Sequence, residues 1–143
     1  MSGSISTPGC RTGNDSPAIG GVIPQVAATM KRQEYNMQIA AVAIVANVFP
    51  QTRGLIFHVP NGGSRNYREA ANLKKMGVVA GVPDIIFIWK RAVHAFEFKS
   101  EDGNLSDKQK EIHELWAEQG VSVTIIRKQA DFVTAIRDII QPK

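Results

Sequence analysis

Apolar residues recur along the chain with two spacings, and the first predicts helices. From Lys31 to Val48 they lie three and four residues apart, which is typical of an amphipathic helix, and Pro50 ends that pattern. The same spacing from Ala130 to Ile140 predicts a closing helix. Two shorter helices are predicted from their end signals. Tyr67 to Met76 is followed by Gly77, and a helix reaching Gln119 opens with the capping-box pattern of Ser106 and Gln109.

Four other segments show strand patterns. Leu55 to Val59 and Val121 to Ile126 are short runs rich in β-branched residues. Ile85 to Trp89 is apolar throughout, which predicts a strand buried on both faces, and Lys90 to Val93 is the expected connection to the next strand. His94 to Lys99 alternates, so that Glu97 and Lys99 share one face of the predicted strand and two phenylalanines share the other.

The order of these elements indicates the fold class. Helix, strand, helix, strand, strand, helix, strand and helix follow one another, without an internal repeat. This order predicts an α/β domain with a mixed central sheet of about four strands and helices on both faces. Residues 1–29 are rich in Gly, Pro, Ser and Thr, which predicts a disordered N-terminal tail before a domain at residues 30–143, and Met30 is an alternative start.

Composition narrows the class of protein. The chain has 143 residues, 43% of them hydrophobic and 21% charged, which fits one globular domain. Its single cysteine, Cys10, cannot form an internal disulfide, and we expect a reducing, cytoplasmic setting. No run of about 18 apolar residues occurs, so we expect no membrane partner. The net charge of +4 is compatible with nucleic acid but does not single it out.

The most informative chemistry lies in two neighbouring predicted strands. Asp84 precedes the first, and Glu97 and Lys99 lie in the second, so a hairpin can bring two carboxylates and an amine together. Carboxylate oxygens suit Mg²⁺ or Mn²⁺, and a lysine beside them can orient or deprotonate an attacking water, which phosphodiester hydrolysis requires. The alternative is that Asp84 caps a turn and that Glu97 and Lys99 form a surface ion pair of about 0–1 kcal/mol.

Five short motifs follow one another in the chain. They are His58 to Gly63, Leu73 to Gly77, Gly81 to Asp84, Glu97 to Lys99, and Leu105 to Gln109. Together they resemble the VRR-NUC domain of the PD-(D/E)xK nuclease superfamily, over about residues 34–140. The resemblance implies a divalent-metal-dependent nuclease on a restriction-endonuclease-like core. It also implies the properties of the small stand-alone members, many of them phage-encoded: homodimers that act on branched DNA such as four-way junctions.

Three rival functions stay open at this point. The first is a flap or general DNA nuclease without preference for junctions. The second is a DNA-binding module without turnover, although an intact set of Asp84, Glu97 and Lys99 argues against a decayed site. The third is a structural protein in which the motifs are accidental.

The resemblance also implies roles for individual residues. It makes Asp84 and Glu97 metal ligands, the backbone carbonyl of Phe98 a third ligand, and Lys99 the catalytic lysine. Glu34, on the first helix, matches an acidic residue that reaches the metal directly or through water. A solvated helix glutamate is the alternative for Glu34.

Gln109 matches a glutamine near the active site of the family. The capping box explains the same residue equally well, and different atoms of one side chain can serve both roles. The acids after the motif lysine, Glu101 and Asp102, depart from the pattern. We expect them to turn toward solvent in a loop.

DNA contacts are expected from two further segments. The glycine-rich loop allows backbone N–H groups to approach a phosphate, and the first helix after it carries a basic face. The alternatives are a loop that only turns the chain and a face that is only solvated. The candidate DNA-binding residues are Asn61, Gly62, Gly63 and Arg65 in the loop, and Arg68, Lys74 and Lys75 on the helix.

Overall fold

The helices and strands of the computed structural model follow the predicted order, and the model describes residues 23–61 and 66–143. None of the helices in these two ranges is long and apolar enough to cross a membrane. The elements are α1 (Pro24–Val48), the short 3-10 turn η1 (Pro50–Thr52), β1 (Ile56–His58), α2 (Tyr67–Lys75), β2 (Ile85–Trp89), β3 (Ala92–Phe98), α3 (Asp107–Glu118), β4 (Val123–Ile126) and α4 (Gln129–Ile140).

The first helix begins earlier than the sequence pattern predicts. α1 starts at Pro24 rather than Lys31, so residues 24–29 belong to the helix and not to a disordered tail. Proline is favourable in the first turn of a helix, where its missing N–H has no partner to lose. The five residues that follow it contain no glycine and include two alanines, but the composition of the whole N-terminal segment hides this. Residues 1–22 of the predicted tail lie outside the described ranges.

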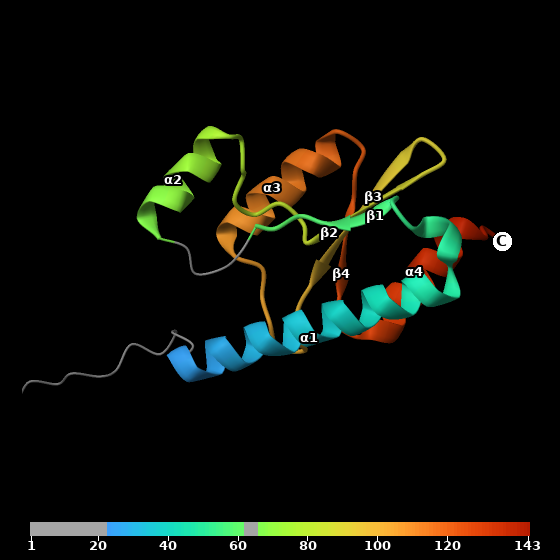
Figure 1. Ribbon diagram of the computed structural model, residues 1–143, viewed down its shortest axis with the longest axis horizontal. Helices are drawn as coiled ribbons and strands as arrows, with labels where there is room; N and C mark the ends of the chain where they lie inside the picture. The colour runs from blue at the N-terminus through green and yellow to red at the C-terminus, as the bar shows by residue number, and fades with distance from the viewer. Residues whose placement is uncertain (1–22, 62–65) are drawn as a thin grey trace, which may run out of the picture.

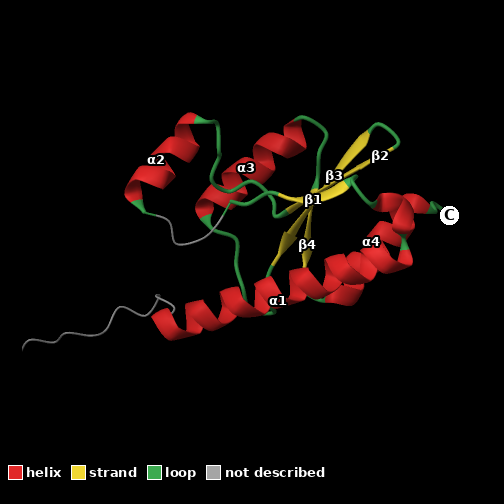
Figure 2. Ribbon diagram, in the orientation of Figure 1, coloured by secondary structure: helices red, strands yellow, loops and turns green. Residues whose placement is uncertain are grey.

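The strands form one mixed sheet in the order β1-β2-β3-β4. The first two pairings are antiparallel, and β3 pairs with β4 in parallel. Helices α1 and α4 lie on one side of this sheet, and α2 and α3 lie on the other (Figure 1, Figure 2). The N-terminal half of α1 extends past the sheet (Figure 1). The predicted α/β class with a four-stranded mixed sheet between helices is therefore confirmed.

The core lies on the side of α1 and α4. Phe132 of α4 meets Phe96 edge-on at a centroid distance of 5.0 Å and Phe98 at 5.3 Å. The two sheet phenylalanines lie two residues apart, which places both on the same face of β3. The buried core comprises Ala41, Val45, Phe49, Ile85, Phe87, Phe96, Phe98, Ile126, Phe132 and Ile136.

The opposite face of the sheet is covered only in part. Ile86 and Ala95 are buried there, but further along the same strands Ile88 is 43% exposed and Val93 is 40% exposed. The prediction that β2 is buried on both faces is therefore wrong at its far end. The run of apolar residues alone gives no sign of where the covering helix stops.

A two-residue turn sets the register of the central hairpin. Lys90 and Arg91 have φ values of 45° and 70°, so β3 begins at Ala92 rather than His94. Positive φ at both central residues gives the turn whose twist suits a tight hairpin, although Lys and Arg seldom adopt it. Ile85 pairs with Phe96 in this register. Asp84, the residue just before β2, therefore lies opposite Glu97 of β3. The hairpin therefore brings the two predicted carboxylates face to face.

Gly81 holds the segment before β2 against α3. Its φ is +88°, and a Cβ at this position would lie 2.6 Å from the carbonyl oxygen of Lys108. Gly120 has a similar φ of +82° but open space around it. We expect Gly120→Ala to lower the free energy of unfolding by about 1–2 kcal/mol, from backbone strain alone. We expect Gly81→Ala to lower the free energy of unfolding by at least about 2 kcal/mol more than Gly120→Ala does, because the added methyl group overlaps the backbone of α3.

Urea unfolding of the two variants beside the wild type measures this difference. Equal losses for the two variants would contradict the close approach of the Gly81 segment to α3.

Candidate active site

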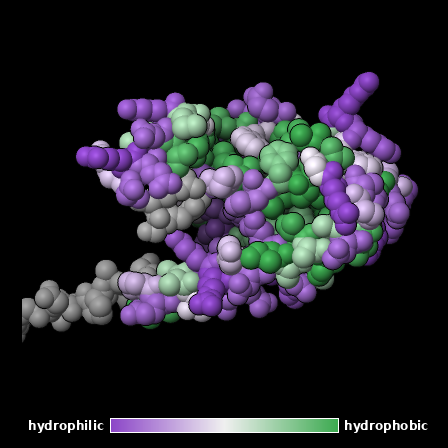
Figure 3. All heavy atoms as spheres, in the orientation of Figure 1, coloured by the Kyte–Doolittle hydropathy of each residue, from purple (hydrophilic) through white to green (hydrophobic). Residues whose placement is uncertain are grey.

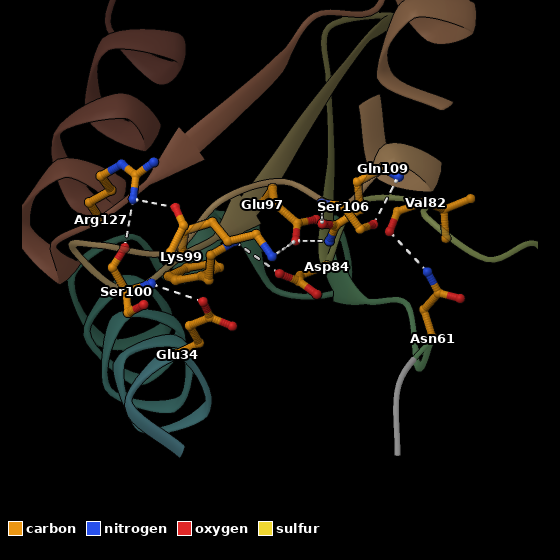
Figure 4. A network of polar contacts seen from close by, with 12 residues as sticks. Glu34, Asn61, Val82, Asp84, Glu97, Lys99, Ser100, Ser106, Gln109 and Arg127 are labelled. Atoms are coloured by element: carbon orange, nitrogen blue, oxygen red, sulfur yellow. Dashed lines mark hydrogen bonds and ion pairs between the residues drawn. The ribbon is translucent and has the colours of Figure 1, made fainter. Parts of the chain in front are cut away.

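Asp84 lies where three strands meet. Its Oδ2 accepts a hydrogen bond of 2.9 Å from the backbone N–H of Phe98, so its carboxylate is tied to β3 (Figure 4). Its backbone carbonyl accepts the N–H of Val59 at 2.9 Å and lies 2.8 Å from Nδ1 of His58. These contacts fix Asp84 at the start of β2, and they place His58 beside the site.

Glu97 projects from β3 on the face opposite the phenylalanines and is only 2% exposed. Its Oε1 accepts a hydrogen bond from Nε2 of Gln109 on α3 and lies 3.4 Å from Nζ of Lys99 (Figure 4). Its Oε2 is buried and has no hydrogen-bond partner among the described residues. A buried carboxylate oxygen without a partner is unfavourable unless a cation or a donor completes its surroundings.

Glu34 brings a third carboxylate from α1. Its Oε1 accepts a hydrogen bond of 3.0 Å from the N–H of Ser100, the residue that follows the motif lysine (Figure 4). Gly103 packs so closely here that a Cβ would lie 2.7 Å from Oγ of Ser100 and 3.0 Å from Oε1 of Glu34. The structure therefore holds Glu34 beside the motif instead of leaving it as a solvated helix residue.

Burial and nearby negative charge raise the pKa of two carboxylates of the site. Burial raises the pKa of Asp84 above its ordinary value, against the Phe98 N–H and the positive charge of Lys99, which lower it. Burial and the neighbouring charge of Asp84 raise the pKa of Glu97 to about 7. Glu34 adds negative charge that raises both pKa values. A site in which negative charge is this crowded is stabilised by a cation.

The donor set fits a hard divalent cation that keeps part of its water. The described residues contain no group of three or more His, Cys, Asp and Glu side chains arranged to hold a metal by themselves. The candidate ligands are the carboxylates of Asp84 and Glu97 and the backbone carbonyl of Phe98. That carbonyl points to the β2 side of β3, because its N–H bonds Asp84 and the two groups of one strand residue point the same way. Mg²⁺ is commonly bound by one or two carboxylates plus water and substrate phosphate.

Gln109 makes two kinds of contact through different atoms. Its Oε1 accepts the backbone N–H of Ser106 at 2.9 Å and completes the capping box, while its Nε2 donates to Glu97. We expect Ser106→Ala to lower the free energy of unfolding by about 1 kcal/mol and to leave DNA cleavage unchanged. We expect Gln109→Ala to lower the free energy of unfolding by a similar amount. We also expect it to cleave about tenfold or more slowly, because Glu97 then lacks the hydrogen bond from Nε2 of Gln109.

Cleavage assays paired with thermal unfolding separate these two effects. Equal cleavage rates in the two variants would show that Gln109 acts only as a helix cap.

Only some of the candidate DNA-binding residues lie in the part of the chain that the structure describes. Gly62, Gly63 and Arg65 lie outside the described residues. The basic side chains of α2 are exposed, on a helix in which no residue is buried. The surface between α1 on one side and α2 with α3 on the other is hollowed and hydrophilic (Figure 3). Helix α2, which carries Arg68, Lys74 and Lys75, lies on one side of this hollow (Figure 1, Figure 3).

Asn61 contacts the protein itself. Its Nδ2 donates to the carbonyl of Val82 at 3.0 Å, and its Oδ1 is buried without a partner in the described part of the chain (Figure 4). The side chain therefore ties the start of the glycine-rich loop to the segment that leads into Asp84. A contact between Asn61 and a phosphate stays a prediction.

Three residues near the site were not found from the sequence. Ser100 donates its N–H to Glu34, and Arg127 donates to the carbonyl of Ser100 at 2.6 Å. His113 lies one turn after Gln109 on α3, its Nε2 is buried without a partner, and burial together with the charge of Lys99 lowers its pKa. The four-residue spacing from Gln109 is a signal that could have revealed His113. Ser100 acts through its backbone N–H, and the side chain of Arg127 contacts a backbone carbonyl. Sequence patterns do not show contacts of this kind.

The chain is similar to known proteins in both sequence and structure. The model of the VRR-NUC domain family matches residues 30–130. A solved structure described as a VRR_NUC domain protein superposes with a TM-score of 0.54 at 23% sequence identity, covering 71% of this chain and 85% of the other. At that identity the structural likeness shows the fold alone. No curated protein matches the sequence.

Proposed function

Since this chain belongs to the VRR-NUC domain family, a family of nucleases of the PD-(D/E)xK type, we propose that it is a Mg²⁺- or Mn²⁺-dependent endonuclease that cuts branched DNA as a homodimer. The observation that carries the metal dependence is the unpartnered Oε2 of Glu97. This buried oxygen lies on a carboxylate opposite Asp84 and beside an ammonium group. Together these groups match what phosphodiester hydrolysis needs.

Each residue has a separate task in this proposal. Asp84, Glu97 and the Phe98 carbonyl would hold the cation, and Glu34 would contact it directly or through water. A bound divalent cation supplies a Lewis acid that polarises the phosphodiester and activates water. Lys99, whose ammonium lies 3.4 Å from Glu97, orients the attacking water and offsets the negative charge that develops on the phosphate.

Burial increases the effect of these charges. The Lys99 side chain is 12% exposed and that of Glu97 is 2% exposed. Charges in such surroundings interact more strongly than they do in water. Gln109 holds Glu97 in place while it caps α3, so the orientation of the carboxylate is set before any substrate binds.

The preference for junctions and the homodimer are supported by the resemblance to stand-alone members of the family. An isologous dimer presents two active centres to two opposed strands, which paired cuts in a junction require. An apolar groove of about 490 Å³ lies between α1 and β1, with Ile39 52% and Phe57 46% exposed beside it. Exposed apolar surface of this kind is typical of contact between proteins.

Cleavage of matched substrates tests the proposal. A labelled four-way junction, a flap and a linear duplex of the same sequence are incubated with the protein in Mg²⁺, Mn²⁺ or EDTA, and light scattering measures the molar mass. We expect a dimer that cuts the junction at least about tenfold faster than the duplex, and only with metal.

Each other outcome changes a different part of the proposal. Equal cutting of all substrates would indicate a general nuclease, and preferential cutting of the flap would indicate a flap nuclease. Binding without cutting would indicate a DNA-binding module.

A further inference from the structure

Arg127 holds the turn that follows the catalytic lysine. This residue comes directly after β4, the strand that runs parallel to β3. One nitrogen of its guanidinium, Nη1, lies 2.6 Å from the carbonyl oxygen of Ser100, 3.0 Å from that of Glu101 and 2.9 Å from that of Gly103. Three carbonyls of one turn therefore converge on a single cationic group.

The same turn is held from its other side by α1. The N–H of Ser100 donates to Oε1 of Glu34, and a Cβ on Gly103 would lie 3.0 Å from that oxygen. The turn is closed by a hydrogen bond of 3.0 Å from the N–H of Gly103 to the carbonyl of Ser100. The turn is therefore enclosed between Arg127 on one side and Glu34 on the other (Figure 4).

The start of this turn is also fixed to the sheet. The N–H of Lys99 donates to the carbonyl of Ile126 at 2.9 Å, so the backbone contact with β4 continues one residue past the end of β3. Glu101 and Asp102 point into solvent, as the sequence predicts, so they do not compete for the guanidinium with their side chains. The contacts of Arg127 are with the backbone.

We propose that Arg127 is a positioning residue for the metal site: by holding the Ser100–Gly103 turn, it fixes the N–H that sets where the carboxylate of Glu34 lies. The inference rests on the proposed function, because it assigns Arg127 an effect on the cation that Glu34 helps to bind. Arg127 itself contacts neither Asp84 nor Glu97. Its effect is transmitted through the turn, as residues behind a metal ligand orient that ligand elsewhere.

The test measures Mn²⁺ binding to the protein without DNA, by isothermal titration calorimetry. We expect Arg127→Ala and Glu34→Gln each to weaken binding about tenfold, and the double variant to be no weaker than the weaker single variant. We expect Arg127→Lys, which keeps a cationic donor, to stay within about threefold of the wild type. Lys128→Ala removes one positive charge from the adjacent exposed residue and is expected to bind like the wild type.

Several outcomes would overturn the inference. Wild-type affinity in Arg127→Ala would do so, and so would additive losses in the double variant, because independent effects add. If Arg127→Ala does not fold, Gly103→Ala displaces the same turn without loss of charge, and wild-type affinity in that variant would also overturn it. If the wild type cleaves DNA and binds Mn²⁺, and Arg127→Ala binds Mn²⁺ equally well, only the inference is refuted. Absence of Mn²⁺ binding by the wild type would refute the proposed function as well.

Discussion

Lys99→Ala is expected to cut DNA about a thousandfold more slowly than the wild type, with little change in DNA affinity. The ammonium of Lys99 lies 3.4 Å from Glu97 and is nearly buried, so no solvent cation takes its place at the reacting phosphate. Its removal leaves the other residues of β3 in place, because the backbone pairing of Lys99 with Ile126 does not depend on the side chain. The loss is therefore expected in the chemical step.

Single-turnover cleavage at saturating protein measures this rate without the influence of product release. Lys110→Ala is the matched control, since Lys110 is an exposed lysine of α3 whose side chain, within residues 23–61 and 66–143, pairs only with Asp107, at 3.4 Å. A Lys99→Ala rate within about tenfold of the Lys110→Ala rate would remove Lys99 from the reaction.

Glu97→Gln is expected to make the protein without metal more stable above neutral pH and to abolish the effect of metal. The pKa of Glu97 is raised to about 7 from an ordinary value of 4.5, so the folded state binds this proton more tightly than the unfolded state. Stability is therefore complete below about pH 4.5 and falls as the pH rises through 7, by roughly 3 kcal/mol in all. Glutamine has no proton to lose, and the variant lacks this decrease.

The measurement is thermal unfolding from pH 5 to pH 8, with and without Mg²⁺ or Mn²⁺. At pH 8 a cation that binds the folded wild type raises its melting temperature, whereas Glu97→Gln is expected to show no increase and no cleavage. A variant that is less stable than the wild type at pH 8 without metal would contradict the destabilising burial of this charge. An equal metal effect in both proteins would contradict Glu97 as a ligand.

Local chemistry made much of the fold predictable. The capping box places the start of α3 where the structure has it, and both of its reciprocal hydrogen bonds are present. The alternation in β3 separates Glu97 from the phenylalanines of the core, as the period of two requires. The facing positions of Asp84 and Glu97 follow from the tight hairpin, although the left-handed turn at Lys90 and Arg91 is unusual for these residue types.

Contacts made through the backbone could not be predicted. Nothing in the residue types shows that Arg127 reaches three carbonyls, because their convergence depends on how the turn after β3 is placed. The donation from Asn61 to Val82 likewise depends on two loops that are distant in sequence. The start of α1 was missed for another reason: about two helical turns contribute little to the composition of a long segment.

The measurement that tests the central claim most directly is the return of cleavage when metal is added back to metal-free protein. The protein is treated with chelator, and junction cleavage is followed while Mg²⁺ or Mn²⁺ is titrated in, for the wild type, Asp84→Asn and Asp102→Asn. Asp102 is an exposed acid of the turn after Lys99 and serves as the matched control. The account predicts no cutting before metal is added, full recovery in the wild type and Asp102→Asn, and none in Asp84→Asn. Cutting in the presence of chelator, or recovery in Asp84→Asn equal to that of the wild type, would contradict it.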